Sequence, residues 1–312
     1  MKITYKCVFF HLIVLLSFSY PLYADRSDKC LDYIQRKYYF TVDSIIRDWE
    51  HDSVPDPELF VVKTSYFFSL ASSNLLRIDK KVPIGSKAIP IQHKETGEIY
   101  YIHDDKAYKP EFVDSAISSV KTGIRLFPHR FDLRFGLAYI CQEIGDIKAQ
   151  VSILSQTVEH AKAYPNSVLW AKNKPIANTD SFLIQSLHSY GLYYYQTEED
   201  EKFGQIAKLH VKYFPHSVIG RNDLGNYYGF KRLWRKALEQ YMTAFTGDTT
   251  DMLVLNNIAH TYKKLGDNHN TIKYYTKVIN NTTDQQVKEQ ALDGLNSLQK
   301  KVPPMKRQNN KP

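Results

Sequence analysis

The sequence is poor in cysteine. Of its three cysteines, Cys7 lies in an N-terminal apolar run, which leaves Cys30 and Cys141 for the rest of the chain. Two cysteines are too few for a disulfide framework or for a zinc site built from closely spaced thiolates. They form either one disulfide or two buried thiols. A chain of 312 residues, of which 43% are hydrophobic, is long and apolar enough to fold around a core instead.

Long apolar runs are equally scarce, and the clearest one stands at the N-terminus. Lys2 and Lys6 precede the apolar run from Cys7 to Tyr20, and the small residue Ala24 follows. This is the layout of a secretory signal peptide, and the run is shorter than the roughly 20 residues that span a bilayer. We therefore expect residues 1–24 to be a cleaved signal peptide, with an uncleaved anchor as the alternative. The mature protein is then exported, periplasmic or secreted, and has no membrane span.

The excess of positive charge is confined to the two ends of the chain. The formal net charge is +8, and clustered basic charge attracts nucleic acid or acidic membranes. However, Lys2 and Lys6 leave with the signal peptide, and five further basic residues lie within 300–311, so the body carries only about +1. We expect no nucleic-acid partner, and a solvated, disordered basic tail over 302–312.

Common catalytic and metal-binding motifs are also missing. The sequence has no H-E-x-x-H pair, no G-x-S-x-G elbow, no G-x-x-x-x-G-K-[ST] loop and no G-x-G-x-x-G after a predicted strand. Its 11 histidines show no metal-ligand spacing. These absences favour a protein without catalytic activity, cofactor or metal. An enzyme remains the alternative, and its best candidate residues surround a predicted hairpin: His93, Tyr101, His103, Asp104 and Asp105.

What the sequence does contain is a 34-residue repeat. Three windows, 184–217, 218–251 and 252–285, keep one register without a gap. The matching residues are Tyr190, Gly191 and Tyr194, then Leu224, Gly225 and Tyr228, then Ile258, Ala259 and Tyr262. Large residues three and four places apart share one face of a helix, and a small residue lets two helices approach. Each window is therefore predicted to be an antiparallel helix pair, with Gly191, Gly225 and Ala259 at the crossings.

This pattern resembles the tetratricopeptide repeat, whose signature is W-x2-L-G-x2-Y, then A-x3-F, then P. The resemblance implies an all-α fold, namely an α-solenoid of stacked antiparallel helix pairs forming a superhelix, with one inserted β-hairpin in this chain. Together with the signal peptide it suggests a bacterial secreted or periplasmic member of the family. It also implies a concave groove lined by the first helix of each unit.

The remaining segments are assigned around the repeat. We expect an N-terminal capping helix over 25–56, a degenerate repeat over 57–130 interrupted by a β-hairpin at 87–104, a repeat with a long loop insertion over 131–183, three in-register units over 184–285 and a C-terminal capping helix over 286–301. Within the hairpin, Gly97 belongs to the turn. Pro90 cannot donate a ladder hydrogen bond, so its strand should be an edge. Gly266 and Asp267 should form the turn between the two helices of the last unit.

The resemblance places a set of candidate partner-binding residues in the groove. They are His188, Tyr195, Asn222, Asn226, Asn256, His260 and Lys263. Amides and aromatic side chains that packing does not require can bind the backbone of an extended peptide. The leading hypothesis is thus a non-catalytic scaffold of the cell envelope that binds a protein or an extended peptide. The same residues can also be ordinary hydrophilic surface. A glycan-binding protein of an uptake system is another alternative. It would need an exposed tryptophan near the groove, for which Trp170 in the insertion is the candidate.

One groove type of this family, the clamp that holds a C-terminal carboxylate, is not implied. Asn226 and Asn257 match its two Asn positions, but Asn222, Val287 and Ala291 stand where its Lys and Arg residues belong. Binding of chaperone tails is therefore not expected.

Overall fold

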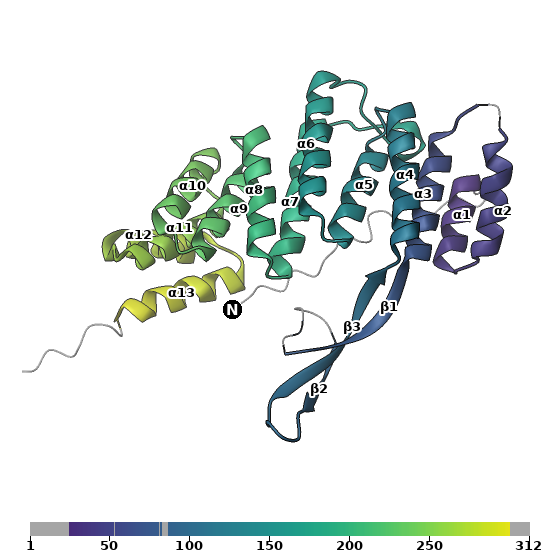
Figure 1. Ribbon diagram of the computed structural model, residues 1–312. Coiled ribbons are helices and arrows are strands. Elements are labelled where there is room, and N and C mark those ends of the chain that lie inside the picture. Colours follow the sequence, from purple (N-terminus) through teal and green to yellow (C-terminus); the bar gives the residue numbers. More distant parts are fainter. Residues whose placement is uncertain (1–24, 53, 81, 83–86, 300–312) are drawn as a thin grey trace, which may run out of the picture. The chain divides into compact units, whose positions relative to one another are not determined.

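The computed structural model describes residues 25–52, 54–80, 82 and 87–299. Within these ranges the chain is an all-α solenoid of helix pairs with two small sheets, which is the predicted fold class (Figure 1). Contacts divide it into two compact units, one ending at Leu183 and one beginning at Ile184. The expected signal peptide, residues 1–24, and the expected tail, residues 302–312, lie outside the described residues.

Among its described residues, unit 1 contains six complete α-helices, a short 3-10 helix (Ala171–Asn173), five strands and the first residues of α7 (Thr179–Gln196). The helices are α1 (Arg26–Gln35), α2 (Tyr39–Glu50), α3 (Pro57–Ala71), α4 (Pro110–Leu126), α5 (Phe131–Glu143) and α6 (Ile147–Ala163). The strands are β1 (Ser72–Asp79), β2 (Ala88–Gln92), β3 (Ile99–Tyr108), β4 (Leu169–Trp170) and β5 (Lys174–Pro175). Cys30 and Cys141 are both free and buried, and burial raises the pKa of the Cys141 thiol to about 11.

The N-terminal segment is a pair of helices, so the prediction of one capping helix over 25–56 is wrong. Helix α1 ends because Lys37 adopts the left-handed conformation, with φ of 62°. The N–H of Tyr38 then donates to the carbonyl of Tyr33 at 2.8 Å, as in a helix-closing motif. This turn brings the apolar faces of α1 and α2 together on α3. The shared buried cluster consists of Cys30, Ile34, Val42, Ile46, Trp49, Leu59, Val62 and Tyr66.

Helices α3 and α4 form the expected degenerate pair, and a sheet is inserted between them. The helices approach closely at Gly123, where an added Cβ would lie 2.7 Å from Cβ of Phe60. The N–H of Lys109 donates to the carbonyl of Ala71 at 3.0 Å, so the end of α3 meets the start of α4. Figure 1 shows the sheet projecting from this junction. The sheet therefore occupies the position of the turn within a helix pair.

The inserted sheet has three antiparallel strands in the order β1-β3-β2. The predicted hairpin is confirmed as β2 and β3, with Gly97 in the turn at φ of 69° and Pro90 in an edge strand. The predicted limits, 87–104, are too narrow, because β3 continues to Tyr108 and pairs with β1. Strand β1 escaped prediction because the adjacent residues Leu75 and Leu76 break the alternation typical of a strand.

The insertion after α6 is shorter and better packed than the long loop insertion expected at the end of 131–183. Helix α7 (Thr179–Gln196) already begins at Thr179. The side-chain oxygen of Asn178 accepts a hydrogen bond from the N–H of Ser181 at 2.9 Å, which caps the helix N-terminus. Val168, in the remaining loop, is buried. The loop is thus part of the packed structure of unit 1.

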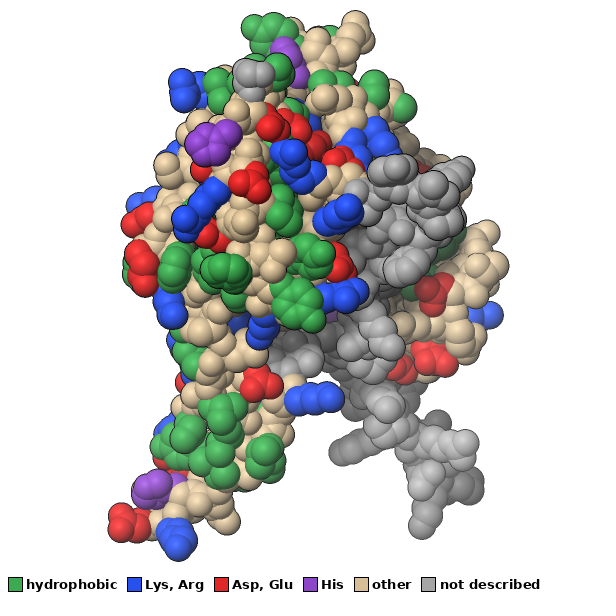
Figure 2. Space-filling model, turned by 90° about the vertical axis from the view of Figure 1, so that its right-hand side faces the viewer, with side chains coloured by type: hydrophobic (Ala, Val, Ile, Leu, Met, Phe, Trp, Pro, Cys, Tyr) green, Lys and Arg blue, Asp and Glu red, His purple; other side chains and the backbone are tan. Residues whose placement is uncertain are grey.

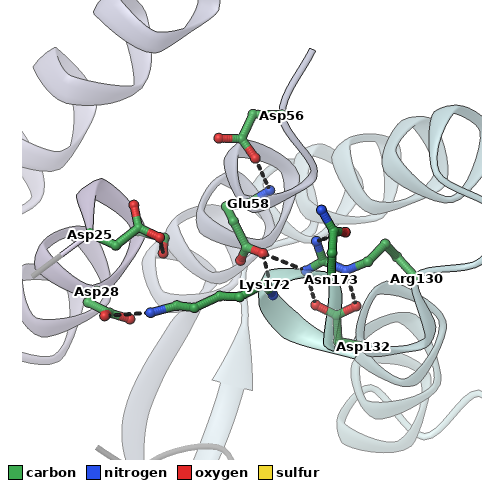
Figure 3. A network of polar contacts seen from close by, with 9 residues as sticks. Asp25, Asp28, Asp56, Glu58, Arg130, Asp132, Lys172 and Asn173 are labelled. Carbon is green, nitrogen blue, oxygen red and sulfur yellow. Dashed lines mark hydrogen bonds and ion pairs between the residues drawn. The ribbon is translucent and has the colours of Figure 1, made fainter. Parts of the chain in front are cut away.

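A buried arginine anchors this loop (Figure 3). Arg130, which is 1% exposed, contacts the carboxylates of Asp132 at 2.6 Å and Glu58 at 2.8 Å. The backbone N–H of Lys172 donates to the same Glu58 carboxylate at 2.7 Å, and its ammonium group contacts Asp28 at 2.6 Å. A buried charge needs such partners, because an unpaired one is strongly destabilising. The network therefore ties the loop to α1, α3 and the start of α5.

Unit 2 begins within α7, at Ile184, and contains six further helices among its described residues. They are α8 (Asp200–Tyr213), α9 (Val218–Phe230), α10 (Trp234–Gly247), α11 (Met252–Leu265), α12 (Asn268–Asn281) and α13 (Gln285–Gln299). Helices α8, α10 and α12 begin 34 residues apart, as do α9 and α11. The caps follow the same period, because the side chains of Ser217 and Asp251 accept backbone hydrogen bonds at the starts of α9 and α11.

The turn inside each pair of unit 2 also repeats. Glu198, Arg232 and Gly266 lie 34 residues apart and have φ values of 60°, 55° and 81°. The left-handed conformation favours glycine, so Gly266 was predictable and the other two were not. Asp267 caps α12 by accepting a hydrogen bond from the N–H of Asn270, which completes the predicted turn.

The predicted helix crossings differ in how tightly they pack. A Cβ added at Gly225 would lie 2.4 Å from the Tyr241 ring, so this position requires glycine. At Gly191 the nearest atom would be 3.6 Å away, in Ile206, which is ordinary van der Waals contact. The prediction that Gly191 must be small for close approach is therefore wrong. Helix α13 buries Val287 and Ala291 against α11 and α12 and closes this core.

Candidate partner-binding face

Polar side chains join the first helices of successive pairs in unit 2. His188 Nδ1 lies 2.7 Å from Asp223 Oδ2, which joins α7 to α9. The amide nitrogen of Asn257 donates to Asn222 Oδ1 at 2.9 Å, which joins α11 to α9. The amide nitrogen of Asn256 donates to Oε1 of Gln290 on α13 at 3.3 Å. In each contact the partners are 34 or 35 residues apart, so the contacts repeat with the helix pairs. We call Asn222, Asn226, Asn256 and Asn257 the amide row.

Asn226 belongs to the same row and also contacts the second helix of its pair. Its Oδ1 accepts a hydrogen bond from the hydroxyl of Tyr241 at 2.8 Å and one from Asn257 Nδ2 at 3.4 Å. Tyr241 is the ring that fills the space beside Gly225. The tight crossing of α9 and α10 therefore fixes the position of the Asn226 amide.

Each amide in the row uses only part of its hydrogen-bonding capacity. Among the described residues, the nitrogens of Asn222 and Asn226 have no partner, and both side chains are half-buried. The side-chain oxygen of Asn256 is buried and has no partner within the described residues. An amide carries two donors and an oxygen acceptor. Donors therefore remain at Asn222 and Asn226 after the contacts between helices are made.

The His188–Asp223 pair adds a titratable group to this face. Burial disfavours the charged imidazolium, but the hydrogen bond and the negative charge of Asp223 outweigh it, so the pKa of His188 is raised. Asp223 is 6% exposed, whereas the His188 side chain retains 31% exposure. His188 is thus both the partner of a buried carboxylate and an exposed polar group.

The other predicted groove residues do not join the row. Tyr195 packs against Phe203 and Phe230, with ring centroids 5.8 and 5.6 Å away. His260 is exposed, and its ring centroid lies 6.4 Å from that of Trp234. Lys263 is half-exposed in the last turn of α11. The row instead includes Asn257, which was not among the predicted binding residues.

Asp223 and Gln290, which complete the contacts of this face, were not among the predicted residues. A usable signal existed, because each lies 34 or 35 residues after a predicted groove residue. The positions of the missing carboxylate clamp are confirmed as unsuitable, since Val287 and Ala291 are buried in the core.

The candidate enzyme residues are divided between the two faces of the sheet and the hairpin turn, with Tyr101, His103 and Asp105 on one face. His103 Nε2 forms a hydrogen bond with Asp79 at 3.0 Å, and Asp105 forms an ion pair with Arg77 at 2.5 Å, so both contacts join β1 to β3. Asp104 lies on the opposite face of the sheet from His103, because successive strand residues alternate. His93 accepts a hydrogen bond from the N–H of Thr96 near the hairpin turn. This arrangement stabilises the sheet.

Two further observations bear on metals and glycans. Within the described residues, no group of three or more His, Cys, Asp or Glu side chains is arranged to hold a metal ion. Trp170 is half-buried, with its ring 6.0 Å from that of Phe135 and 5.2 Å from that of Phe182. It therefore packs within unit 1 and does not form an exposed platform for a sugar ring.

No protein-family model and no curated protein sequence matches this chain. Similar solved structures are tetratricopeptide-repeat proteins. YrrB, described as having an unusual peptide-binding site, is 11% identical, with 59% of this chain and 85% of YrrB covered and a TM-score of 0.38. TTC0263 of Thermus thermophilus is 13% identical, with 60% and 92% covered and a TM-score of 0.33. MamA of Desulfovibrio magneticus is 12% identical, with 55% and 86% covered and a TM-score of 0.35.

These scores are low, so the fold is established by the chain's own features. The 34-residue spacing of the helix starts and of the left-handed turn residues defines the helix-pair repeat. As to membranes, the described residues contain no helix long and apolar enough to cross one.

Proposed function

We propose that this chain is an exported, non-catalytic scaffold that binds an extended segment of a partner protein through the amide row. The observation that carries the proposal is the pair of unpartnered amide nitrogens on Asn222 and Asn226 among the described residues. An extended peptide presents backbone carbonyls at regular spacing, and side-chain amides can donate to them without selecting a particular sequence. Because the oxygens of these amides are fixed by Asn257 and Tyr241, their nitrogens are oriented before a ligand binds.

The His188–Asp223 pair extends this proposed face to α7. Asp223 raises the pKa of His188, and the protonated ring donates from both nitrogens, so we expect peptides with an Asp or Glu near that end to bind best when His188 is protonated. Export is proposed from the signal-like pattern of residues 1–24, and a periplasmic or secreted location follows from it. N-terminal sequencing of the protein from cell fractions tests this part, because a mature N-terminus at Asp25 is expected in an exported fraction.

Binding is tested by crosslinking and affinity capture from the cell-envelope fraction, followed by quantitative binding of peptides from the captured protein. The Asn222→Ala, Asn226→Ala variant should lose at least about tenfold in affinity, because two hydrogen-bond donors are removed. A matched control is Asn268→Ala, which alters an exposed amide on α12, a second helix of the repeat. Equal peptide affinity of the double variant and the control, at equal helicity, would overturn the proposal.

A further inference from the structure

The direction of the backbone groups along the inserted sheet follows from one hydrogen bond. Opposite residues in antiparallel strands alternate between pairs that exchange two backbone hydrogen bonds and pairs whose N–H and C=O groups point away from each other. The N–H of His93 donates to the carbonyl of Glu98 at 2.8 Å, so these two residues form a hydrogen-bonded pair. Along β2 from there, Pro90 and its partner Tyr101 form a pair of the other kind. The carbonyl of Pro90 therefore points away from the sheet, and the backbone groups of Tyr101 point toward β1.

The same alternation determines which groups of β1 point outward. Tyr101 lies opposite Asp79 and bonds to it, so every second residue of β1 before Asp79 also bonds to β3. The residues between them, Asn74, Leu76 and Ile78, direct their N–H and C=O groups away from the sheet. All three are exposed, and no strand in the described part of the chain pairs with this edge.

One edge of the sheet is blocked against further pairing, and the other is open. The middle outward residue of β2 is Pro90, which has no N–H to donate. The middle outward residue of β1 is Leu76, whose N–H has no partner among the described residues. Proteins usually protect exposed edges with proline, with charged side chains or with a covering element. Arg77 and Asp79 do not protect β1, because their ladder groups face β3 and their side chains lie on the opposite side of the sheet from Leu76.

The side chains beside the open edge are partly aliphatic. Leu76 and Ile78 are 71% and 59% exposed, and Ile102 and Ile89 continue the row of Ile78 across the sheet. Figure 2 shows hydrophobic side chains gathered on the projecting sheet. Asp104 lies opposite Leu76 on the same side and is exposed, so this side is mixed in character. The backbone edge, more than the side chains, therefore determines what can bind here.

We propose that the edge of β1 binds an extended segment of a partner protein, which adds to the sheet as a fourth strand. The outward residues repeat at about 6.8 Å, and the backbone of another extended strand offers donors and acceptors at the same spacing. The segment that fits best has aliphatic residues at two alternating positions, opposite Leu76 and Ile78. This surface belongs to unit 1, so the proposal does not depend on binding by the amide row.

A second copy of β1 fits this edge less well than such a segment. Antiparallel pairing centred on Leu76 places Ile78 opposite Asn74 of the second copy, so an amide faces an aliphatic side chain. Pairing centred on Ile78 places Leu76 opposite Lys80 of the second copy and leaves Asn74 without a partner in β1. A different segment has neither constraint, because its residues opposite Leu76 and Ile78 can both be aliphatic.

Amide hydrogen exchange of the full chain, followed by NMR, tests the geometry of the edge. In the free protein the amides of Leu75 and Arg77 should be protected, whereas those of Asn74, Leu76 and Ile78 should exchange at least about tenfold faster. The probe is the capped peptide Lys-Thr-Val-Thr-Val-Thr-Val-Lys, which alternates in the way the edge requires. When it is added, the three outward amides should become protected.

Two substitutions at one position separate the backbone from the side chain. Leu76→Pro places in β1 the residue that blocks β2, so it should weaken binding of the probe at least about tenfold. Leu76→Ala keeps the N–H and should lose less. Unchanged protection of Arg77 in Leu76→Pro shows that the sheet is intact. A probe that is N-methylated at its central valine provides the same test with the wild-type protein, and it should also bind at least about tenfold more weakly.

The remaining outcomes overturn the proposal. A probe that does not bind at millimolar concentration shows that the edge does not accept a strand. Equal affinity for wild type and Leu76→Pro, or for the plain and the N-methylated probe, places binding elsewhere. Self-association that sedimentation velocity detects in wild type and not in Leu76→Pro makes a second copy the occupant. The Asn222→Ala, Asn226→Ala variant should bind the probe as wild type does, so failure at this edge is distinct from failure at the amide row.

Discussion

Gly191 and Gly225 occupy the same repeat position 34 residues apart, yet they meet different neighbours. We expect Gly225→Ala to destabilise unit 2 by about 1–3 kcal/mol, because the new Cβ would lie 2.4 Å from the buried Tyr241 ring. Gly191→Ala has room and should be neutral or stabilising by up to about 1 kcal/mol, since alanine favours helix. Urea unfolding of the two variants measures this difference. Equal changes at both sites would show that Tyr241 can move aside.

His210 is a buried residue whose protonation opposes folding. It is 1% exposed, its Nε2 lies 3.0 Å from the Ser217 hydroxyl, and its Nδ1 has no partner among the described residues. Burial, together with the charge of His188, lowers the pKa of His210 to about 4 from 6.5. The unfolded chain therefore takes up a proton first as the pH falls. Stability should be lost between pH 6.5 and about 4, and is fully present above pH 6.5.

The variant His210→Leu isolates this contribution. It removes the titrating group. Between about pH 7.5 and pH 4.5, both proteins should lose stability, but the decrease in the unfolding free energy should be about 1–3 kcal/mol smaller for the variant than for wild type. Urea unfolding at several pH values gives both curves, and the comparison uses their slopes because the substitution also alters packing. Parallel curves would mean that His210 is accessible to protons in the folded chain.

At the residue scale, the sequence predicted where the groove residues lie better than it predicted what their side chains contact. His188, Asn222, Asn226 and Asn256 do lie on first helices, as the repeat register required. Their hydrogen-bond partners belong to the next helix pair, so whether an amide is free depends on contacts that the spacing alone does not specify. Binding through these residues stays a prediction.

Among the elements, the loop after α6 depends on one carboxylate more than on another. Glu58 accepts hydrogen bonds from the Lys172 backbone and from buried Arg130, whereas the ion pair of Asp28 is with the half-exposed Lys172 ammonium group. Glu58→Ala should therefore destabilise unit 1 by about 3 kcal/mol and speed tryptic cleavage after Lys172. Asp28→Ala should change stability by less than about 1 kcal/mol.

Timed proteolysis of the two variants, followed by mass spectrometry, separates these effects. The expected result is early cleavage after Lys172 in Glu58→Ala and near wild-type cleavage in Asp28→Ala. If cleavage begins elsewhere in unit 1, the loop is held by packing of Val168 and its neighbours more than by the network.

Periodic elements were predictable and irregular ones were not. The three helix pairs follow from the 34-residue spacing, and the hairpin follows from its turn and Pro90. Strand β1 was missed because it continues directly from α3, and its pairing with β3 is a long-range contact. Glu198 and Arg232 were missed as turn residues because their left-handed conformation is imposed by the pairs they connect.

For the molecule as a whole, a repeat array gains stability from contacts between neighbouring units, so its ends need a cap. In unit 2, α13 supplies Val287 and Ala291 to the core that contains Leu255, Ile258 and Tyr275. Gly294 lets it approach closely, because an added Cβ would lie 2.3 Å from the Tyr275 ring.

Ending the chain at Asn281 should therefore expose the core between α11 and α12 and lower the local stability of that pair by about 3 kcal/mol. Hydrogen exchange should show the loss of protection first in α11 and α12 and less in α9, since each pair mainly contacts its neighbours. A chain ending at Gln299 is the matched control and should keep wild-type protection in all three helices. If protection falls equally in α9, α11 and α12, unit 2 unfolds as one cooperative body, and the stability of a helix pair does not depend mainly on its immediate neighbour.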